Sequence, residues 1–377
     1  MITHRNLREL IDRDPRPGSP TLSIYLDIDQ SDAANLNRKF EVALFNMLRE
    51  LETTLDGPLQ RDFHADAILI QHFVEGYRPR AKGLAIFSDS SEDFFWAYEL
   101  HVPVKTEARW SEMPYLRPLL EMMDEHERYG VILTDRSRTR LFSIFLGEIE
   151  EYHEALAEAN VTRSKTSGRD HIRSQVRNQR RADERAVGHL KEVAELMEAV
   201  AGRLEFDRLV LAGSVEATNE VYRQLSKSLQ GKVIGMIALP LDASEQQVLG
   251  ETLKLSTSSE RTGEIEIVKH LIQAAQKQNQ ATIGLDNTIA AVQAGRVRQL
   301  VYAEGWTPSG SRCSNCSSLM LDGEDVCRYC GADLHAVKDL LARAARRVVA
   351  MGGAVEQVRG DAATHLREAG GIGAFLR

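Results

Sequence analysis

The four cysteines of the chain all lie in one short segment, "CSNCSSLMLDGEDVCRYC". Cys313 and Cys316 are separated by two residues, and Cys327 and Cys330 repeat this spacing after ten intervening residues. Each C-x-x-C turn can direct two thiolates at one point, and two such turns supply the four sulfur ligands of a tetrahedral zinc site. Four protein ligands leave no position for a reactive water. We therefore expect Zn²⁺ here in a structural role and not a catalytic one.

Other interpretations of these cysteines fit less well. A reducing cytosol disfavours a disulfide framework. A redox pair or an iron–sulfur cluster is also disfavoured, because thioredoxin-type C-x-x-C motifs normally occur singly. Four reduced thiols without a metal remain the alternative to the zinc site.

A second candidate site is the basic segment "RSKTSGRDHIRSQVRNQRR", residues 163–181, which holds seven Lys and Arg and a single Asp. If a helix begins near His171, helical spacing places four arginines close to one face. Guanidinium groups at this density suit phosphates, which they bind through paired hydrogen bonds. The four arginines are Arg169, Arg173, Arg177 and Arg180, flanked by Lys165 and Arg181.

Charge alone leaves two interpretations of the basic segment open. A solvated helix face paired with Asp183 and Glu184 explains it as well as a phosphate contact does. The residues around Lys165 include no apolar anchor, which is typical of a mobile loop. A basic loop that leads into a basic helix favours RNA as the partner.

The familiar catalytic signatures are absent from the sequence. Neither Gly-x-Ser-x-Gly nor His-Glu-x-x-His occurs. The segment "LVLAGS" resembles a phosphate-binding turn, but Gly213 stands alone and no Gly-Lys-Ser/Thr follows it. An ordinary turn between a strand and a helix explains it better. Nothing in these motifs requires an enzyme.

Length and composition indicate what kind of protein carries these candidate sites. A chain of 377 residues with 43% apolar and 27% charged residues can form two or three globular domains. It has no apolar run of about 18 residues and no signal-peptide pattern at its start, so we expect a cytoplasmic protein without membrane contact. The net charge of −8 argues against indiscriminate nucleic-acid binding but allows a local basic patch.

The periodicity of apolar residues predicts an α/β fold of three domains. For residues 1–125 we expect strands at 21–29, 65–70, 82–90 and 94–104 and a helix within 35–55. For residues 126–243 we expect a hairpin at 129–152, strands at 206–212 and 232–242, and a helix from Asp183. Its apolar stripe is Val187, Leu190, Ala194, Met197, Ala201 and Leu204. For residues 244–377 we expect helices at 244–255, 264–280 and 336–353, a strand at 298–303 and the zinc ribbon at 313–330.

Several of these segments together resemble the archaeal and eukaryotic class-1 peptide release factors and their relative Pelota. The run from "RSQVRNQRR" to "LVLAGS" resembles the central domain, in which a basic helix follows the catalytic loop. "TIGLDNTIAAVQAGRVRQLVY" and "GGIGAFLR" resemble the third domain, where archaeal members carry a similar four-cysteine insertion. "LNRKFEVALFNMLREL" resembles the helix after the codon-reading loop. The resemblance implies a three-domain, tRNA-shaped protein that binds the ribosomal A site.

The catalytic and codon-reading residues of that family are missing. Gly-Gly-Gln occurs nowhere in the chain, and its place is taken by His171, Ile172 and Arg173. The Asn-Ile-Lys-Ser motif falls near residues 31–34, which read "SDAA", and no cysteine precedes Cys313 to serve as its partner. The chain is thus similar to the bacterial branch without Gly-Gly-Gln, which includes Balon, a hibernation factor that occupies the A site with elongation factor Tu.

The resemblance implies a non-catalytic ribosome-binding factor that acts in hibernation or in rescue of stalled ribosomes. Its expected partners are the ribosome and elongation factor Tu or another translational GTPase. The residues expected to contact ribosomal RNA of the A site and peptidyl transferase centre are Lys165, Arg169, His171, Arg173, Gln175, Arg177, Arg180 and Arg181.

Two alternatives remain. The first is a peptidyl-tRNA hydrolase in which Gln175 or His171 replaces the missing glutamine. Against it, glycines normally let the backbone of such a loop approach its target closely, and the neighbouring residues here are bulky. The second is a stress-related RNA-binding protein unconnected to the A site.

Overall fold

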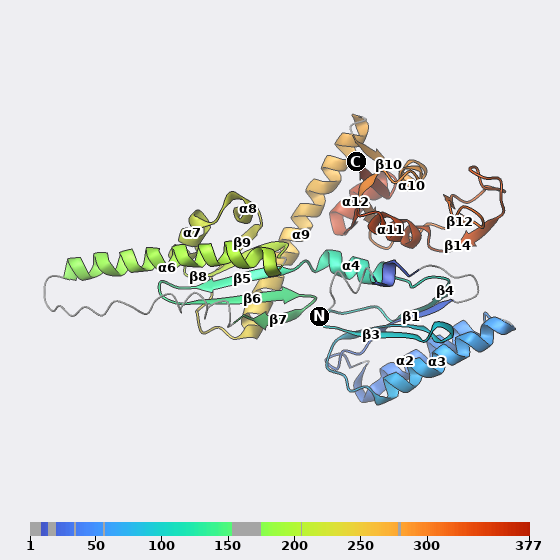
Figure 1. The fold of residues 1–377 in the computed structure, drawn as a ribbon, viewed down its shortest axis with the longest axis horizontal. Helices are drawn as coiled ribbons and strands as arrows, with labels where there is room; N and C mark the ends of the chain where they lie inside the picture. Colours follow the sequence, from blue (N-terminus) through green and yellow to red (C-terminus); the bar gives the residue numbers. More distant parts are fainter. Residues whose placement is uncertain are drawn as a thin grey trace. The chain divides into compact units, whose positions relative to one another are not determined.

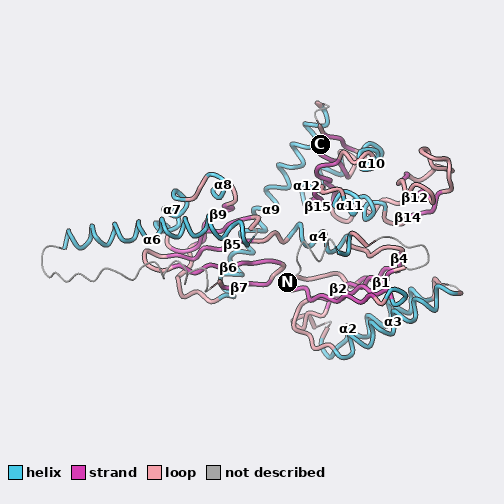
Figure 2. Tube along the Cα trace, viewed as in Figure 1, coloured by secondary structure: helices cyan, strands magenta, loops and turns pink. Residues whose placement is uncertain are grey.

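The computed structural model describes residues 9–13, 20–33, 35–55, 57–152, 175–204, 206–277 and 280–377. The strands form four separate sheets, and helices alternate with them along the chain (Figures 1 and 2). This confirms the predicted α/β class. The chain forms two compact units, Met1–Glu125 with Arg261–Arg377 and, separately, His126–Glu260. The three-domain division with a boundary near residue 243 and the tRNA-like shape stay predictions. No helix within the described ranges is both long and apolar enough to cross a membrane.

The first unit begins with an antiparallel sheet of order β3-β2-β1-β4. Along β1, Leu22, Ile24 and Leu26 are buried under two helices, while Tyr25 lies on the opposite face because strand side chains alternate. The elements are β1 (Thr21–Asp27), η1 (Leu36–Arg38), α2 (Lys39–Glu52), α3 (Pro58–Gly76), β2 (Gly83–Asp89), η2 (Ser90–Glu92), β3 (Phe94–Leu100), β4 (Glu107–Ser111) and α4 (Arg117–Glu125).

The predicted strand at residues 65–70 is wrong, because this segment lies within α3. The buried apolar residues are Phe63, Ala67, Ile70 and Val74, which recur every three or four positions, whereas Ile68 is 50% exposed. A short apolar run does not distinguish a strand from a helix by itself. The helical period becomes visible only when the flanking residues are included.

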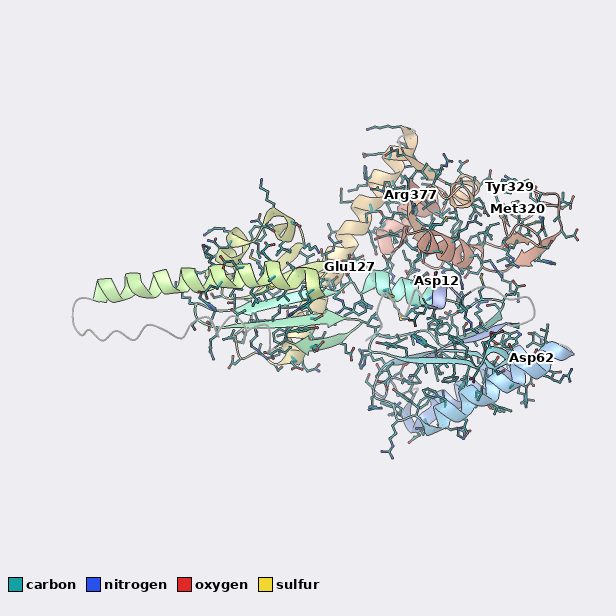
Figure 3. All side chains as sticks on the ribbon, viewed as in Figure 1. Asp12, Asp62, Glu127, Met320, Tyr329 and Arg377 are labelled. Atoms are coloured by element: carbon teal, nitrogen blue, oxygen red, sulfur yellow. The ribbon has the colours of Figure 1, made fainter. Side chains whose placement is uncertain are left out.

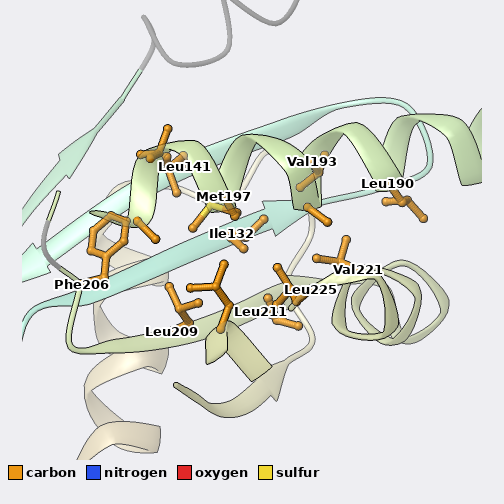
Figure 4. Close-up of a cluster of buried hydrophobic side chains, with 14 of the residues drawn as sticks. Ile132, Leu141, Leu190, Val193, Met197, Phe206, Leu209, Leu211, Val221 and Leu225 are labelled. Atoms are coloured by element: carbon orange, nitrogen blue, oxygen red, sulfur yellow. The ribbon is translucent and has the colours of Figure 1, made fainter. Parts of the chain in front are cut away.

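The second unit contains a five-stranded sheet of order β7-β6-β5-β8-β9. Its first three strands are antiparallel, as the predicted hairpin requires, and β5, β8 and β9 are parallel. Helices α6 and α7 pack on one face of the sheet (Figure 4). The elements are β5 (Tyr129–Thr134), β6 (Thr139–Phe145), β7 (Glu148–Glu151), α6 (Gln175–Leu204), β8 (Arg208–Gly213), α7 (Val215–Gln224), α8 (Lys227–Gln230) and β9 (Val233–Ile237).

The predicted apolar stripe of α6 is largely confirmed. Leu190, Ala194, Met197 and Ala201 are buried against β5, β8 and α7 (Figure 4), and Leu204 is partly buried there. The side chain of the sixth member, Val187, lies outside the described residues. Two further stripe members, which the sequence interpretation missed, are Val193 and Val200.

The first unit continues after the second with a mixed sheet of order β10-β16-β11-β15 and the small cysteine-bearing sheet β13-β12-β14. The two helices predicted at 244–255 and 264–280 are one helix, α9, because the polar stretch between them stays helical. Helix α9 (Glu245–Gln276) begins in the second unit, and its part from Arg261 onwards belongs to the first. The remaining elements are β10 (Ala281–Ile283), α10 (Leu285–Gln293), β11 (Val297–Ala303), β12 (Gly310–Cys313), β13 (Leu319–Met320), β14 (Leu334–Val337), α11 (Leu340–Ala350), β15 (Ala354–Val358), α12 (Gly360–Glu368) and β16 (Ile372–Leu376).

A buried arginine joins the two sequence segments of the first unit. Arg117 is 5% exposed and donates from Nε to Glu121 Oε1 at 2.7 Å and from Nη1 to Asp339 Oδ2 at 3.1 Å. Its Nη2 donates to the carbonyl oxygen of Trp306 at 3.2 Å, and its guanidinium lies over the ring of Tyr302. Burial lowers the pKa of Arg117, but Asp339 and Glu121 outweigh burial and raise it above its ordinary value. The guanidinium is therefore charged at every working pH.

Replacing Arg117 by Met would leave Asp339 and Glu121 as poorly solvated carboxylates without their cation. We expect the first unit to lose about 3–5 kcal/mol of unfolding free energy, the cost typical of a broken buried ion pair. Urea denaturation followed by tryptophan fluorescence measures this unit selectively, because the three tryptophans, Trp96, Trp110 and Trp306, all belong to it.

The matched control is Arg296→Met, which removes the same charge from an exposed position of the same unit. This variant should change the free energy of unfolding by less than about 0.5 kcal/mol. Equal effects of the two substitutions would show that the Arg117 network contributes nothing specific.

Candidate functional site

The four cysteines converge in the small sheet of the first unit, as predicted. The Sγ atoms of Cys313 and Cys330 are 3.4 Å apart, those of Cys316 and Cys327 3.5 Å, and all four lie within 4.8 Å of one another. Cys313 and Cys327 are buried, whereas Cys316 and Cys330 are exposed. Four sulfur atoms at these separations are suited to a single metal ion.

The two C-x-x-C turns have the same local geometry. The residue after the second cysteine of each turn is in the left-handed region, Ser317 with φ 56° and Gly331 with φ 73°. In the first turn, the backbone N–H groups of Asn315 and Cys316 both donate to Cys313 Sγ at 3.4 Å. A left-handed serine is an uncommon backbone state. The sequence interpretation missed Ser317, although its position matches that of Gly331 in the second turn.

The turns are attached to the sheet by backbone hydrogen bonds. The Cys313 N–H donates to Ser318 O, and the Cys327 N–H donates to Ala332 O, both at 2.9 Å. Met320, 2% exposed, packs in one small cluster with Cys313 and Cys327, whereas Tyr329 is 55% exposed. Both residues are labelled in Figure 3. So small a hydrophobic cluster stabilises little by itself, and segments of this kind usually rely on a metal for their folding energy.

The surroundings shift the pKa values of three of the cysteines in different directions. Hydrogen bonds from Ser318 lower the pKa of Cys316 to about 6, and the backbone N–H of Ala332 lowers that of Cys330. For Cys313, the backbone N–H of Cys316 lowers the pKa, but burial and the neighbouring sulfur atoms raise it to about 11. Because four thiolates this close repel one another, they become fully ionised only when a bound cation replaces their protons.

The site also matches the dimensions of zinc. With Zn–S bonds of about 2.3 Å, a regular tetrahedron has sulfur–sulfur edges of about 3.8 Å, close to the separations observed here. The residues that would hold Zn²⁺ are the four cysteines alone, and the ion would fix the two turns against each other. The identity of the metal stays a prediction.

The basic segment is described only from the start of α6 onwards. Lys165, Arg169, His171 and Arg173 lie outside the described residues. Gln175, Arg177, Arg180 and Arg181 lie on the first two turns of α6, with side chains that are likewise not described. A helix that includes these last four residues agrees with the predicted helical state. Their contact with RNA stays a prediction.

The backbone of α6 nevertheless places these positions relative to the sheet. Burial of the described side chains begins at Leu190, and the helix starts 15 residues earlier at Gln175, a length of about 22 Å. Figure 1 shows this half of α6 extending beyond the ends of β5, β6 and β8.

The turn at Gly213 is a structural feature and not a phosphate site. Gly213 has φ 135°, and a Cβ atom there would lie 2.0 Å from the carbonyl oxygen of Thr134 in β5. Ser214 then begins α7, accepting a hydrogen bond from the Ala217 N–H. The glycine is required because β5 and β8 approach each other closely at this point.

Comparison with a family model supports the resemblance found in the sequence. Residues 114–256 match the model of bacterial archaeo-eukaryotic release factor family 10. The matched segment takes in nearly the whole second unit, including α6. The similarity to release factors therefore holds for this part of the chain. No curated protein matches the chain.

Solved structures of translation factors are similar at low identity. The archaeal translation termination factor aRF1 is 16% identical, with 99% of this chain and 96% of aRF1 covered and a TM-score of 0.24. Dom34 of S. cerevisiae, a translation termination-like factor that interacts with Hbs1, is 9% identical, with 78% of this chain and 80% of Dom34 covered and a TM-score of 0.41. Ribosome-bound archaeal Pelota is 12% identical, with 100% of this chain and 94% of the Pelota chain covered and a TM-score of 0.40. Values this low transfer no site residue to this chain.

The metal site is tested by replacing Cys327 with Ser. This removes a buried thiolate ligand, so we expect zinc per chain, measured by plasma mass spectrometry, to fall from about one to well below one. The matched control, Ser314→Ala, changes an exposed residue of the other turn that is not a ligand and should keep the zinc content. Unchanged zinc in Cys327→Ser would contradict a four-sulfur site.

Proposed function

We propose that this protein is a non-catalytic ribosome-binding factor that occupies the ribosomal A site in hibernation or in rescue of stalled ribosomes. The observation that carries the proposal is the match of residues 114–256 to a release-factor family in a chain that has no Gly-Gly-Gln. In release factors this tripeptide orients the hydrolytic water. A chain that keeps the surrounding segment without it is suited to binding and not to peptide release.

The form of α6 supports a role in binding RNA. Its first 15 residues carry Arg177, Arg180, Arg181 and Arg185 against two acids, Asp183 and Glu184. A helix that extends beyond its sheet would hold its arginine positions at regular spacing along one rod. Guanidinium groups placed in this way can bind phosphates of ribosomal RNA.

The proposed partners and the metal follow from this role. The main partner is ribosomal RNA of the A site and the peptidyl transferase centre, and delivery is by elongation factor Tu or another translational GTPase. Structural Zn²⁺ would hold the ribbon around Cys313 and Cys327 in one conformation.

Ribosome binding is tested by replacing Arg173, Arg177 and Arg180 together with Ala. If these arginines contact phosphates, co-sedimentation with vacant 70S ribosomes should weaken. The slope of log affinity against log salt should also become shallower by about 2–3, roughly one for each lost phosphate contact.

A matched control removes the same total charge elsewhere on the second unit. Arg203, Arg223 and Lys227 are exposed and lie far along the chain from the start of α6. Their triple replacement by Ala should leave both the affinity and the salt slope nearly unchanged. If both triple variants weakened ribosome binding equally, the basic segment would contribute only through the overall charge of the protein and not through specific phosphate contacts. No co-sedimentation of the unaltered protein at low or moderate salt would overturn ribosome binding itself.

The absence of catalysis is tested separately on ribosomes that carry peptidyl-tRNA. We expect the protein to bind without releasing the peptide, measured as labelled peptide set free over time. Release that is abolished by Gln175→Ala would instead establish a peptidyl-tRNA hydrolase with an altered loop.

A further inference from the structure

A cavity of about 270 Å³ lies in the first unit, between the end of β4 and the segment that joins β14 to α11. Its apolar lining includes Trp110, Leu116 and Val337. The volume is near the lower limit of small-molecule sites, about 300 Å³. The cavity therefore has room for a compact ligand.

Cations dominate the polar lining of this cavity. Arg109, Lys338, Arg343 and Arg346 line it, and Asp339 is the one acid among the described lining residues. The charge of Asp339 is already paired, because its carboxylate accepts hydrogen bonds from Arg117 and from the Ala342 N–H. The cavity is left with a clear excess of positive charge.

One cation of the lining has a donor without a partner. Arg343 Nη1 is buried and has no hydrogen-bond acceptor within the described part of the chain. Burial and the neighbouring Arg312 lower the pKa of Arg343, and Glu112 only partly opposes this. Glu112 is itself bound to Arg312, with 2.9 Å between Oε2 and Nη2. Buried donors without acceptors are rare in folded proteins, and an unrecorded ion or ligand is a common reason for them.

The neighbouring arginine of α11 has a different role. Arg346 donates from Nη2 to the carbonyl oxygens of Ile11 at 2.5 Å and Arg13 at 2.6 Å, so it holds the N-terminal segment in place. Arg343 has no comparable structural bond from its Nη1. Arg343 also lies in the first turn of α11, where the helix dipole favours a negative charge.

We propose that this cavity binds a phosphoryl group. A phosphoryl group supplies several strong acceptor oxygens and negative charge, which would satisfy the orphan donor of Arg343 and offset the excess of cations together. Arg343 and Arg109 are the residues that would bind it, and Lys338 would add a third cation at the rim. The phosphoryl group could belong either to a free nucleotide or to the backbone of an RNA chain.

The experiment is calorimetric titration of the full chain with three probes: pyrophosphate, GDP and an RNA octamer with a 5′-hydroxyl end. We expect the protein to bind at least one probe, with affinity that falls as NaCl rises. Arg343→Met keeps the length of the side chain and removes the charged donors, so it should weaken that binding by about tenfold or more. The control Arg296→Met, an exposed arginine of the same unit, should leave it within about twofold.

The probes distinguish the two sources. Arg343-dependent binding of GDP and pyrophosphate but not of the octamer identifies a free nucleotide, and Arg343-dependent binding of the octamer alone identifies RNA. Binding that is the same in the unaltered protein and in Arg343→Met overturns the proposal, as does failure of all three probes to bind at millimolar concentration. If tryptophan fluorescence shows that Arg343→Met is unfolded, Arg109→Met on β4 replaces it with the same expected loss.

Discussion

The Arg117 guanidinium is the interaction on which the first unit depends. One planar cation binds Glu121 on its own helix, Asp339 at the start of α11 and the carbonyl oxygen of Trp306 after β11. These partners lie about 190 to 220 positions away in the chain, apart from Glu121. Tyr302 closes the network, since its hydroxyl donates to Glu121 Oε1 at 3.0 Å. Residues 1–125 and 261–377 are therefore held together by charge and hydrogen bonds in addition to hydrophobic packing.

The same network explains why the neighbouring cavity is positive. Asp339 would neutralise a nearby arginine if it were available, but Arg117 and the N-terminus of α11 already occupy its oxygens. The positive charge of Arg343 is therefore not neutralised by Asp339. Partly buried cations without a close anion are costly to keep, which is why a ligand of opposite charge is the natural complement of such a site.

The sequence was sufficient for the features that depend on local spacing. The doubled C-x-x-C pattern predicted the convergence of Cys313, Cys316, Cys327 and Cys330, because each short turn fixes its own geometry. The stripe of α6 was recognised from its period. The strand predicted at 65–70 failed because its apolar run was read without the flanking residues, Phe63 and Val74. The Arg117 network and the cavity could not be predicted, since they join residues far apart in the chain whose individual types are unremarkable.

The cysteine ribbon and the Arg117 network are neighbours in the chain. The ribbon is continuous with the rest of the unit, because a single residue, Lys338, separates β14 from Asp339. Arg312 on β12 likewise lies near Arg343. The strand that ends the cysteine ribbon therefore leads directly into the acid that binds Arg117, so one short stretch of chain serves both the cysteine cluster and the junction between residues 1–125 and 261–377.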